Sequence, residues 1–273
     1  MLGTEERRKG IVFGEHFAQP WSMAKSCFII DDERAVRGGR RISLHFTASG
    51  DRIPAILLQP LEPRPAPAAL LLHGYSSDKE RISDSAGKAL LGLGVATLAI
   101  DLPLHGERVR AGGAAGLPAE ESRNPIRLAQ RWRAALKECR TALDCLASLP
   151  EVDGSRIALI GYSMGAYLGV MLASDEPLVH ALVLAAGGDL PDELPFAALI
   201  RKMVDPIGAI RRYAGRPLLM VNGRNDRTIR AAQAERLYAA AAEPKSILWY
   251  DGGHWLPDGA VRQAAAWVAE SLG

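Results

Sequence analysis

The sequence predicts an α/β fold in which helices cover both faces of a mostly parallel central sheet of about eight strands. The first observation behind this prediction is a regular alternation. Short runs that are apolar at every position are separated by amphipathic segments of helical length, as expected of parallel strands buried on both faces. The second is size: the chain has 273 residues, of which 48% are hydrophobic, enough for the core of one such domain. No internal repeat or low-complexity linker divides the chain, so we expect a single domain.

The order of the elements can be followed along the chain. Two strand-like stretches, 41–48 and 53–60, come before a Pro-rich connector, LEPRPAPA, and the regular alternation follows it. A glycine ends the helix predicted at 83–94, and Pro150 follows the long helix predicted at 124–148. Further strands are predicted at 69–74, 95–101, 156–161, 178–188, 216–223 and 246–252, and further helices at 163–174, at 231–243 and at the C-terminus.

Two segments do not fit the alternation. Residues 1–40 precede the regular part of the chain and contain Phe17, Trp21 and Phe28, so we expect an N-terminal arm that packs on the body or on a second subunit. Residues 189–212 are longer than a simple crossover between strands requires. Because they carry apolar residues at helical spacing, we expect a short cap helix over the carboxyl edge of the sheet, ended by Pro206 and Gly208. The apolar positions are Phe196, Leu199, Ile200, Met203 and Val204.

Charge and cysteine content exclude several classes of function. The formal net charge is only +2, with both signs mixed along the chain, which argues against a nucleic-acid-binding protein. No run approaches the ~18 apolar residues of a membrane span, and the charged N-terminus leads into no apolar signal region. The three cysteines lack the spacing of a metal site. We therefore expect free or buried thiols, no metal, and a cytoplasmic location.

Ser163 is the candidate nucleophile. It lies in GYSMG (161–165), a G-x-S-x-G pattern with an apolar strand directly before it and a helix directly after it. That context predicts a sharp strand-to-helix turn, which presents the hydroxyl at the N-terminus of the helix and needs small neighbours on both sides. The alternative is a glycine-bordered turn without a chemical role.

His254 is the candidate base, because a serine hydroxyl needs one at neutral pH. It lies in YDGGHW, after the last strand and before the last helix, which places it at the same sheet edge as Ser163. His73 and His105 also follow strands but precede the serine in the chain. A packing role is expected for His16, His45 and His180.

Asp226 is the candidate acid that orients His254, because it follows the penultimate strand at the same edge of the sheet. The serine, the acid and the histidine would then occur along the chain in the order Ser163, Asp226, His254, which is one of the known orders of a serine, acid and histidine triad. Asp189, after the preceding strand, stays as an alternative. Asp251 is too close in the chain to His254 to approach its Nδ1 well.

Two backbone amides are the candidate donors of an oxyanion hole. The N–H of Met164 follows the nucleophile directly, and the N–H of Tyr75 lies in the loop after the strand at 69–74. The glycine at position 74 lets this backbone approach a substrate closely.

Five segments occur in this order along the chain: LLLHGYSS, IDLPLHGER, GYSMG, NGRNDRT and GGHW. On them, residues 41–273 resemble the α/β-hydrolase superfamily, and most of all its dienelactone-hydrolase-like and prolyl-oligopeptidase-like serine hydrolases and small bacterial carboxylesterases. The resemblance implies the α/β-hydrolase fold. The loop at 101–108 is similar to the D-x-x-G-H-G loop of those groups, with Leu104 where glycine is usual. Dienelactone hydrolases use cysteine where this chain has Ser163, which argues against dienelactone activity.

These residues predict a serine hydrolase that forms an acyl-enzyme and needs no cofactor. The expected reaction is carboxylesterase cleavage of small-molecule esters with small to medium acyl groups, with Phe196 and Trp255 as candidate pocket residues. A thioesterase, an amidase or a carbon–carbon hydrolase would use the same triad, so these stay open. An inactive binding protein of the same fold is the alternative outside enzymes. Arg123, Arg127 and Arg131 are spaced four apart, and we expect a solvated helix face there.

Overall fold

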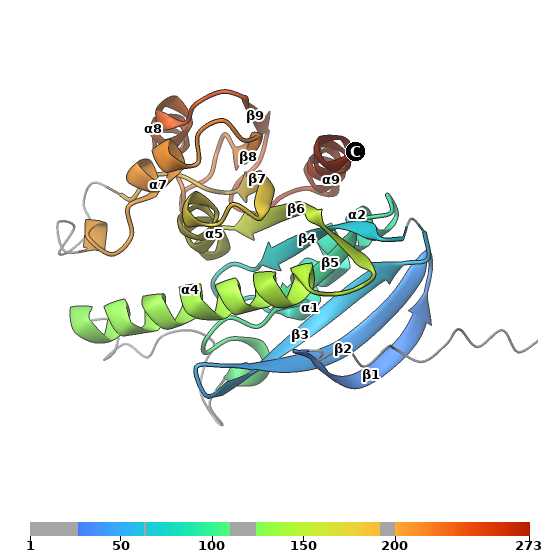
Figure 1. The fold of residues 1–273 in the computed structure, drawn as a ribbon. Coiled ribbons are helices and arrows are strands. Elements are labelled where there is room, and N and C mark those ends of the chain that lie inside the picture. The colour runs from blue at the N-terminus through green and yellow to red at the C-terminus, as the bar shows by residue number, and fades with distance from the viewer. Residues whose placement is uncertain (1–26, 63, 110–123, 192–199) are drawn as a thin grey trace, which may run out of the picture.

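The computed structural model describes residues 27–62, 64–109, 124–191 and 200–273. In this part of the chain a nine-stranded sheet is covered by helices on both faces (Figure 1). The predicted α/β fold with a mostly parallel sheet is confirmed. The sheet has nine strands where about eight were expected, because the sequence patterns did not reveal the first one.

The strand order is β1-β2-β3-β5-β4-β6-β7-β8-β9. The first three strands are antiparallel to their neighbours, and every pairing from β5 through β4 to β9 is parallel. The strands are β1 (Ile29–Val36), β2 (Gly39–Ala48), β3 (Asp51–Pro60), β4 (Ala66–Leu72), β5 (Ala96–Ile100), β6 (Val152–Tyr162), β7 (Val179–Ala185), β8 (Leu218–Gly223) and β9 (Lys245–Tyr250).

The helices connect the parallel strands. The segment expected as one helix at 83–94 is longer and irregular, since α1 and α2 are joined by a π-helical turn at Ser83–Gly87. The longest helix, α4, is capped by the Asn124 side chain, which accepts from the amides of Ile126 and Arg127. The helices are α1 (Lys79–Ile82), α2 (Lys88–Leu91), α4 (Pro125–Ala147), α5 (Met164–Asp175), α7 (Pro206–Arg212), α8 (Ala231–Ala240) and α9 (Asp258–Leu272).

Two hydrophobic cores lie on opposite faces of the sheet. One core packs α4, α5, α7 and α8 against the sheet, with Leu143, Leu168 and Ile210 among its buried residues. The other packs the α1–α2 segment and α9 against the opposite face, with Leu90 and Val268 among its buried residues. Because the parallel strands are covered on both sides, their carboxyl ends form the edge at which side chains from several loops can meet.

Part of the expected N-terminal arm belongs to the sheet. Residues 1–26, with Phe17 and Trp21, lie outside the described residues. The segment from 29 to 40 forms β1 and the start of β2, and Phe28 packs edge-on against Phe46 with ring centroids 5.8 Å apart. Most β1 side chains are exposed, so this edge strand lacks the apolar pattern that revealed the others.

The expected cap helix differs in its boundaries. Pro206 was expected to end a helix, but it is the first residue of α7, and the Asp205 side chain caps that helix by accepting from the Gly208 amide at 2.9 Å. A proline is favourable at this position because its missing N–H has no partner in the first turn. Residues 192–199, which include Phe196, lie outside the described residues, and the cap over the sheet edge stays a prediction.

The cysteines differ from expectation. Cys27 and Cys145 form a disulfide across 118 residues of sequence, so three free thiols were the wrong prediction. Cys139 is a buried free thiol, and burial raises its pKa. Within the described ranges, no helix is long and apolar enough to cross a membrane.

Candidate active site

Ser163 stands at the junction of β6 and α5, where the chain turns sharply. Its φ of 53° and ψ of −111° lie outside the regions that residues with a Cβ prefer. Hydrogen bonds hold this conformation on both sides. The Ser163 amide donates to the carbonyl of Ala185 at 2.9 Å, and its carbonyl accepts from the amide of Ala166 at 2.9 Å. The residue is 8% exposed, so the hydroxyl is held in a largely enclosed place.

The glycines around Ser163 allow three backbone segments to come together. A Cβ on Gly161 would overlap the Gly165 carbonyl, and one on Gly165 would overlap the Leu72 carbonyl at the end of β4. A Cβ on Gly74 would lie 2.8 Å from the Tyr162 ring and 3.3 Å from the Ser163 Cβ. The backbone that leads to Tyr75 therefore lies directly beside the serine.

The structure joins Ser163, His254 and Asp226 by hydrogen bonds. The His254 Nε2 is 2.9 Å from the Ser163 Oγ, and the His254 Nδ1 is 2.8 Å from Oδ2 of Asp226. A carboxylate can only accept, so Nδ1 carries the proton and the lone pair of Nε2 faces the serine hydroxyl. The second Asp226 oxygen accepts from the amides of Thr228 at 2.7 Å and Ile229 at 3.0 Å. These bonds fix the carboxylate and leave Oδ2 for the imidazole.

The two loops that carry Asp226 and His254 pack against each other. The Asn225 amide donates to the Gly252 carbonyl at 2.9 Å, and a Cβ on Gly223 would overlap the carbonyls of the same loop. The Tyr162 hydroxyl donates to the His254 carbonyl at 2.9 Å. His254 is thus anchored from β6, by the residue directly before Ser163. Burial raises the pKa of Tyr162, so the hydroxyl keeps its proton and stays a donor.

The alternative acids have other partners. Asp189 is 4% exposed and binds Arg201 at 3.0 Å and Arg236 at 3.3 Å. The Asp251 side chain is 93% exposed and lies 3.7 Å from Arg224. Neither carboxylate is placed on the imidazole, so the arrangement around His254 favours Asp226.

His73 and His105 shape the loops beside the serine. The Leu102 amide donates to the His73 Nε2 at 3.1 Å, so Nδ1 carries the proton and donates to the Gly74 carbonyl at 2.8 Å. Burial lowers the pKa of His73 to about 4, which keeps this ring neutral. The His105 ring lies 5.2 Å from that of His73 and 5.4 Å from that of Tyr75. The rings hold the Tyr75 loop against the loop that follows β5.

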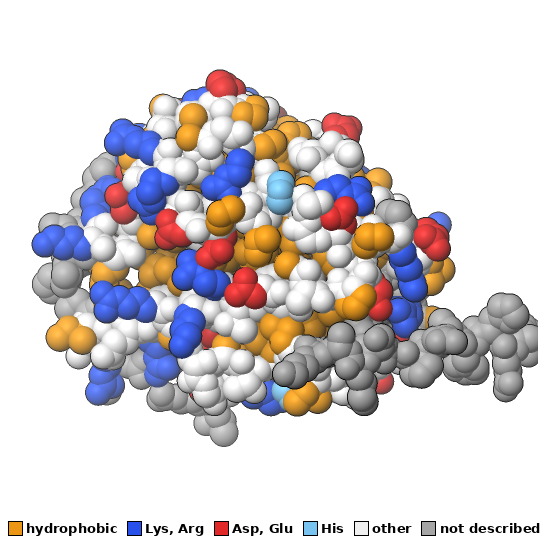
Figure 2. Space-filling model, viewed as in Figure 1, with side chains coloured by type: hydrophobic (Ala, Val, Ile, Leu, Met, Phe, Trp, Pro, Cys, Tyr) orange, Lys and Arg blue, Asp and Glu red, His pale blue; other side chains and the backbone are white. Residues whose placement is uncertain are grey.

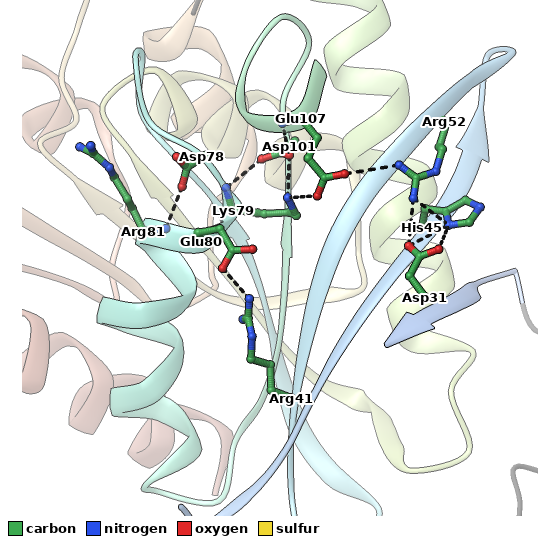
Figure 3. A network of polar contacts seen from close by, with 10 residues as sticks. All are labelled: Asp31, Arg41, His45, Arg52, Asp78, Lys79, Glu80, Arg81, Asp101 and Glu107. Atoms are coloured by element: carbon green, nitrogen blue, oxygen red, sulfur yellow. Dashed lines mark hydrogen bonds and ion pairs between the residues drawn. The ribbon is translucent and has the colours of Figure 1, made fainter. Parts of the chain in front are cut away.

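A buried lysine joins the same two loops. Lys79, at the start of α1, is 4% exposed, and Asp101, at the end of β5, is fully buried. Figure 3 shows the Lys79 Nζ between two carboxylates. It lies 2.9 Å from Oδ2 of Asp101 and 2.7 Å from Oε1 of Glu107. The Asp101 oxygens also accept from the backbone amides of Lys79 and Glu107, each at 2.9 Å. Sequence patterns did not reveal this cluster.

The charges in the cluster support one another. Burial disfavours the Lys79 ammonium, but the hydrogen bonds that it donates to Glu107 and Asp101, together with their negative charges, outweigh this effect and raise its pKa. The hydrogen bond from Lys79 is the largest of the effects that lower the pKa of Glu107. Lys79 and Glu107 are therefore charged at neutral pH. Their contacts with the buried Asp101 side chain join the two loops that carry them. Arg52 extends the contacts to β1, where it binds Asp31 at 3.0 Å (Figure 3).

A match to a protein-family model shows which family this chain belongs to. The model described as serine hydrolase (FSH1) matches residues 66–266, which is well over half of the chain. The chain belongs to this serine hydrolase family. The match includes β4 to β9 and every residue of the hydrogen-bonded chain at Ser163.

Individual relatives of this serine hydrolase carry less information about substrate. An uncharacterised protein of Mycobacterium tuberculosis is 33% identical over 199 residues, covering 70% of this chain and 64% of the relative. A Bacillus subtilis protein named MhqD is 25% identical over 146 residues, covering 50% of this chain and 63% of the relative. The matched regions thus span less than two thirds of the length of these relatives.

Solved structures share the fold of this serine hydrolase at low identity. Acetyl xylan esterase 1 from Thermoanaerobacterium superposes with a TM-score of 0.72 at 22% identity, covering 90% of this chain and 88% of the other. A cold-adapted esterase from an Arctic intertidal metagenomic library superposes with a TM-score of 0.70 at 19% identity, covering 93% and 100%. At this level of identity the likeness shows the α/β-hydrolase fold.

An apolar cavity opens beside the candidate oxyanion-hole residues of the serine hydrolase. This α4 cavity has a volume of about 170 Å³ and is lined by Tyr75 and Met164, by the loop after β5 and by one face of α4. Leu104, one of its walls, has a φ of 65°, a conformation that favours glycine. The other lining residues are Leu102, Pro103, His105, Leu128, Arg131, Trp132, Ala135 and Leu168.

Two other predictions from the sequence concern Trp255 and the arginine series, and these residues lie at a different cavity or only in part near the α4 cavity. Trp255 is 67% exposed and lines a different cavity, on the face covered by α9. In the arginine series, Arg123 lies outside the described residues, Arg127 is exposed and Arg131 lines the α4 cavity. Figure 2 shows charges of both signs interspersed over the face that carries α4. The cavity residues of α4 were missed because only the fold reveals which face of that helix lies near Tyr75 and Met164.

Proposed function

We propose that this serine hydrolase is a carboxylesterase that cleaves small to medium acyl esters through an acyl-enzyme on Ser163. The observation that carries the proposal is the hydrogen-bonded chain from Ser163 through His254 to Asp226. The similarity in fold to structures named as esterases supports the choice of ester bonds. A thioester or amide bond would use the same residues, and nothing in the described part of the chain favours either.

The geometry supports a two-step acyl transfer. As the Ser163 Oγ attacks the ester carbonyl, the His254 Nε2 takes its proton, and Asp226 stabilises the imidazolium that forms. The amides of Tyr75 and Met164 would donate to the oxygen that becomes negative. His254 then returns the proton to the leaving alcohol. In the second step it activates water, which hydrolyses the acyl-enzyme and frees the serine.

The size of the α4 cavity supports a modest acyl group. Its volume of about 170 Å³ is close to the ~150 Å³ of an apolar cavity that admits benzene. The cavity begins at Tyr75 and Met164, the residues proposed to hold the oxyanion, so the acyl chain of a bound ester would extend into it. Its apolar walls suit a hydrocarbon chain, and because its volume is small, we expect short or medium chains to be cleaved faster than long ones.

The test is hydrolysis of p-nitrophenyl esters from acetyl to palmitoyl by the parent protein and by Ser163→Ala. We expect activity to peak at short or medium chains and to fall on the order of 10⁶-fold in kcat in the variant, as for loss of a nucleophile from such a unit. Ser246→Ala, an exposed serine on β9, serves as the matched control and should keep full activity. Full activity in Ser163→Ala would overturn the assignment of the nucleophile. A peak at palmitoyl would contradict the assignment of the acyl site.

A further inference from the structure

A second cavity lies on the opposite face of the sheet from the α4 cavity. This α9 cavity has a volume of about 250 Å³ and lies between the α1–α2 segment and α9. Ile160 and Val183 form its floor on the sheet, while Ile82, Ala86 and Leu90 form one wall and Ala264 and Ala265 the other. The chemistry proposed for Ser163 makes no use of it.

Small side chains leave this space open. The α9 helix presents Ala264 and Ala265 to the sheet, and the opposing π-helical turn presents Ala86. Protein interiors are otherwise packed as densely as organic crystals, with few voids larger than a water molecule. A cavity of 250 Å³ exceeds the ~150 Å³ of an apolar cavity that binds benzene.

The walls and the mouth define what would bind. The walls are mostly aliphatic and aromatic, with His73, Ser77 and Ser85 as uncharged polar members, so burying a charged group there would cost free energy. Two exposed side chains of opposite charge, Arg81 and Asp258, line the cavity as well, so its charged groups balance. In Figure 3 the Arg81 guanidinium points away from the Lys79 cluster. We propose that the α9 cavity is a second binding site, for an uncharged apolar molecule about the size of a substituted benzene.

An occupant of the α9 cavity would touch the supports of the catalytic base. Tyr162 and Trp255 both line the cavity, and their rings stack with centroids 6.0 Å apart. The Tyr162 hydroxyl donates to the His254 carbonyl at 2.9 Å, and Trp255 is the next residue in the chain. The site is therefore distinct from the acyl site proposed above but adjoins the residues that position His254.

The test measures binding of 4-fluorobenzyl alcohol by ¹⁹F NMR. The titration uses Ser163→Ala protein, so the result does not depend on the function proposed above. We expect saturable binding that Ala86→Leu and Ala264→Leu, on opposite walls, each weaken at least about tenfold, since one methylene in an apolar pocket is worth about 10- to 200-fold. Ala89→Leu adds the same atoms on the same segment outside the cavity, and Ala135→Leu fills the α4 cavity. Both should leave binding unchanged.

A second readout does not require the wall variants to fold. In Ser163→Ala protein with both cavities unchanged, protons of the bound probe should show nuclear Overhauser contacts to the indole of Trp255. Contacts to Trp132, which lines the α4 cavity, would overturn the proposal. Absence of saturable binding would overturn it too, as would binding that Ala135→Leu weakens and the two wall variants do not.

Discussion

Ser163 holds a backbone conformation that is unfavourable for a residue with a Cβ. Strained φ and ψ angles of this kind cost about 1–3 kcal/mol each and persist only where the surroundings determine them. Here the hydrogen bond from the Ser163 amide to Ala185 and the close approach of Gly161 to Gly165 provide that constraint. Some stability is therefore given up at Ser163, the residue proposed above as the nucleophile.

Asp226→Asn is expected to lower kcat on the order of 10⁴-fold for p-nitrophenyl acetate, because the amide no longer holds the proton on Nδ1 of His254. The side chain keeps its size, so KM should change little. Asp189→Asn is the matched control, since that buried carboxylate binds two arginines and does not touch the imidazole. It should lower thermal stability and keep kcat within a few fold. Equal losses of kcat in both variants would contradict the role of Asp226.

At the level of residues, the sequence was sufficient to predict that Ser163, Asp226 and His254 lie close together. Each follows an apolar strand, and the carboxyl ends of parallel strands share one edge of the sheet, so position along the chain predicted proximity. Lys79 and Glu107 follow no such rule. Their ion pair joins positions 28 residues apart through a partly buried contact, and a lysine next to an acidic residue is typical of any solvated surface.

Elements with strong local signals were predicted well, and those defined by context were not. The helix expected at 124–148 is found at 125–147 because Asn124 caps it. The first strand was missed because its side chains are exposed on both faces. Pro206 was misread because a proline can follow one helix or begin the next, and only the Asp205 cap distinguishes the two.

The start of α1 yields a prediction about the loop that carries Tyr75. Lys79→Met leaves the buried Asp101 without its counter-ion, so the loop should lose its fixed position. We expect kcat to fall up to about 10²-fold with KM nearly unchanged, because small misplacements of catalytic groups have effects of this size. Steady-state kinetics on protein whose folding is verified by circular dichroism would measure this.

The matched control for this variant is Lys88→Met. Lys88 is 60% exposed and pairs with Asp84 within the same helical segment, so its loss should affect neither kcat nor KM. Lys79→Arg keeps the charge and should recover part of the activity. If Lys79→Met is folded and retains normal kcat, the cluster does not position the loop.

Across the whole molecule, the sheet separates two cavities that adjoin different parts of the candidate site. The α4 cavity lies beside the oxyanion-hole candidates, and the α9 cavity lies behind Tyr162 and Trp255. The disulfide between Cys27 and Cys145 ties the chain just before β1 to α4. No spacing rule links cysteines 118 residues apart, so this bond could be recognised only from the fold.

Global stability should depend on pH through His73. Burial lowers the pKa of His73 from 6.5 to about 4 in the folded chain. Between these values the unfolded chain binds a proton that the folded chain does not, so the free energy of unfolding rises with pH across this window. The stabilisation is complete above pH 6.5 and lost as the pH falls towards 4, by on the order of 3 kcal/mol in total.

Urea unfolding at pH 7 and pH 4.5 would measure this dependence. His73→Gln should be less stable than the parent at pH 7 but should lose less stability between the two pH values. The pKa of His105 is also lowered by burial, so some dependence should remain. His180→Gln, at an exposed position, should behave as the parent protein does. An unchanged difference between the two pH values in His73→Gln would contradict the assignment.

Leu104 has a consequence for attempts to improve this protein by laboratory evolution. Its left-handed backbone would make glycine at this position attractive in a selection for heat resistance, since relief of that strain is worth about 1 kcal/mol. The same side chain also lines the polar pocket containing Arg52 and Arg108, so it forms a wall shared with the α4 cavity. Heat-resistant descendants with glycine at this position would lose discrimination between acyl groups. Selection for heat resistance would therefore favour glycine, and selection for acyl specificity would favour leucine.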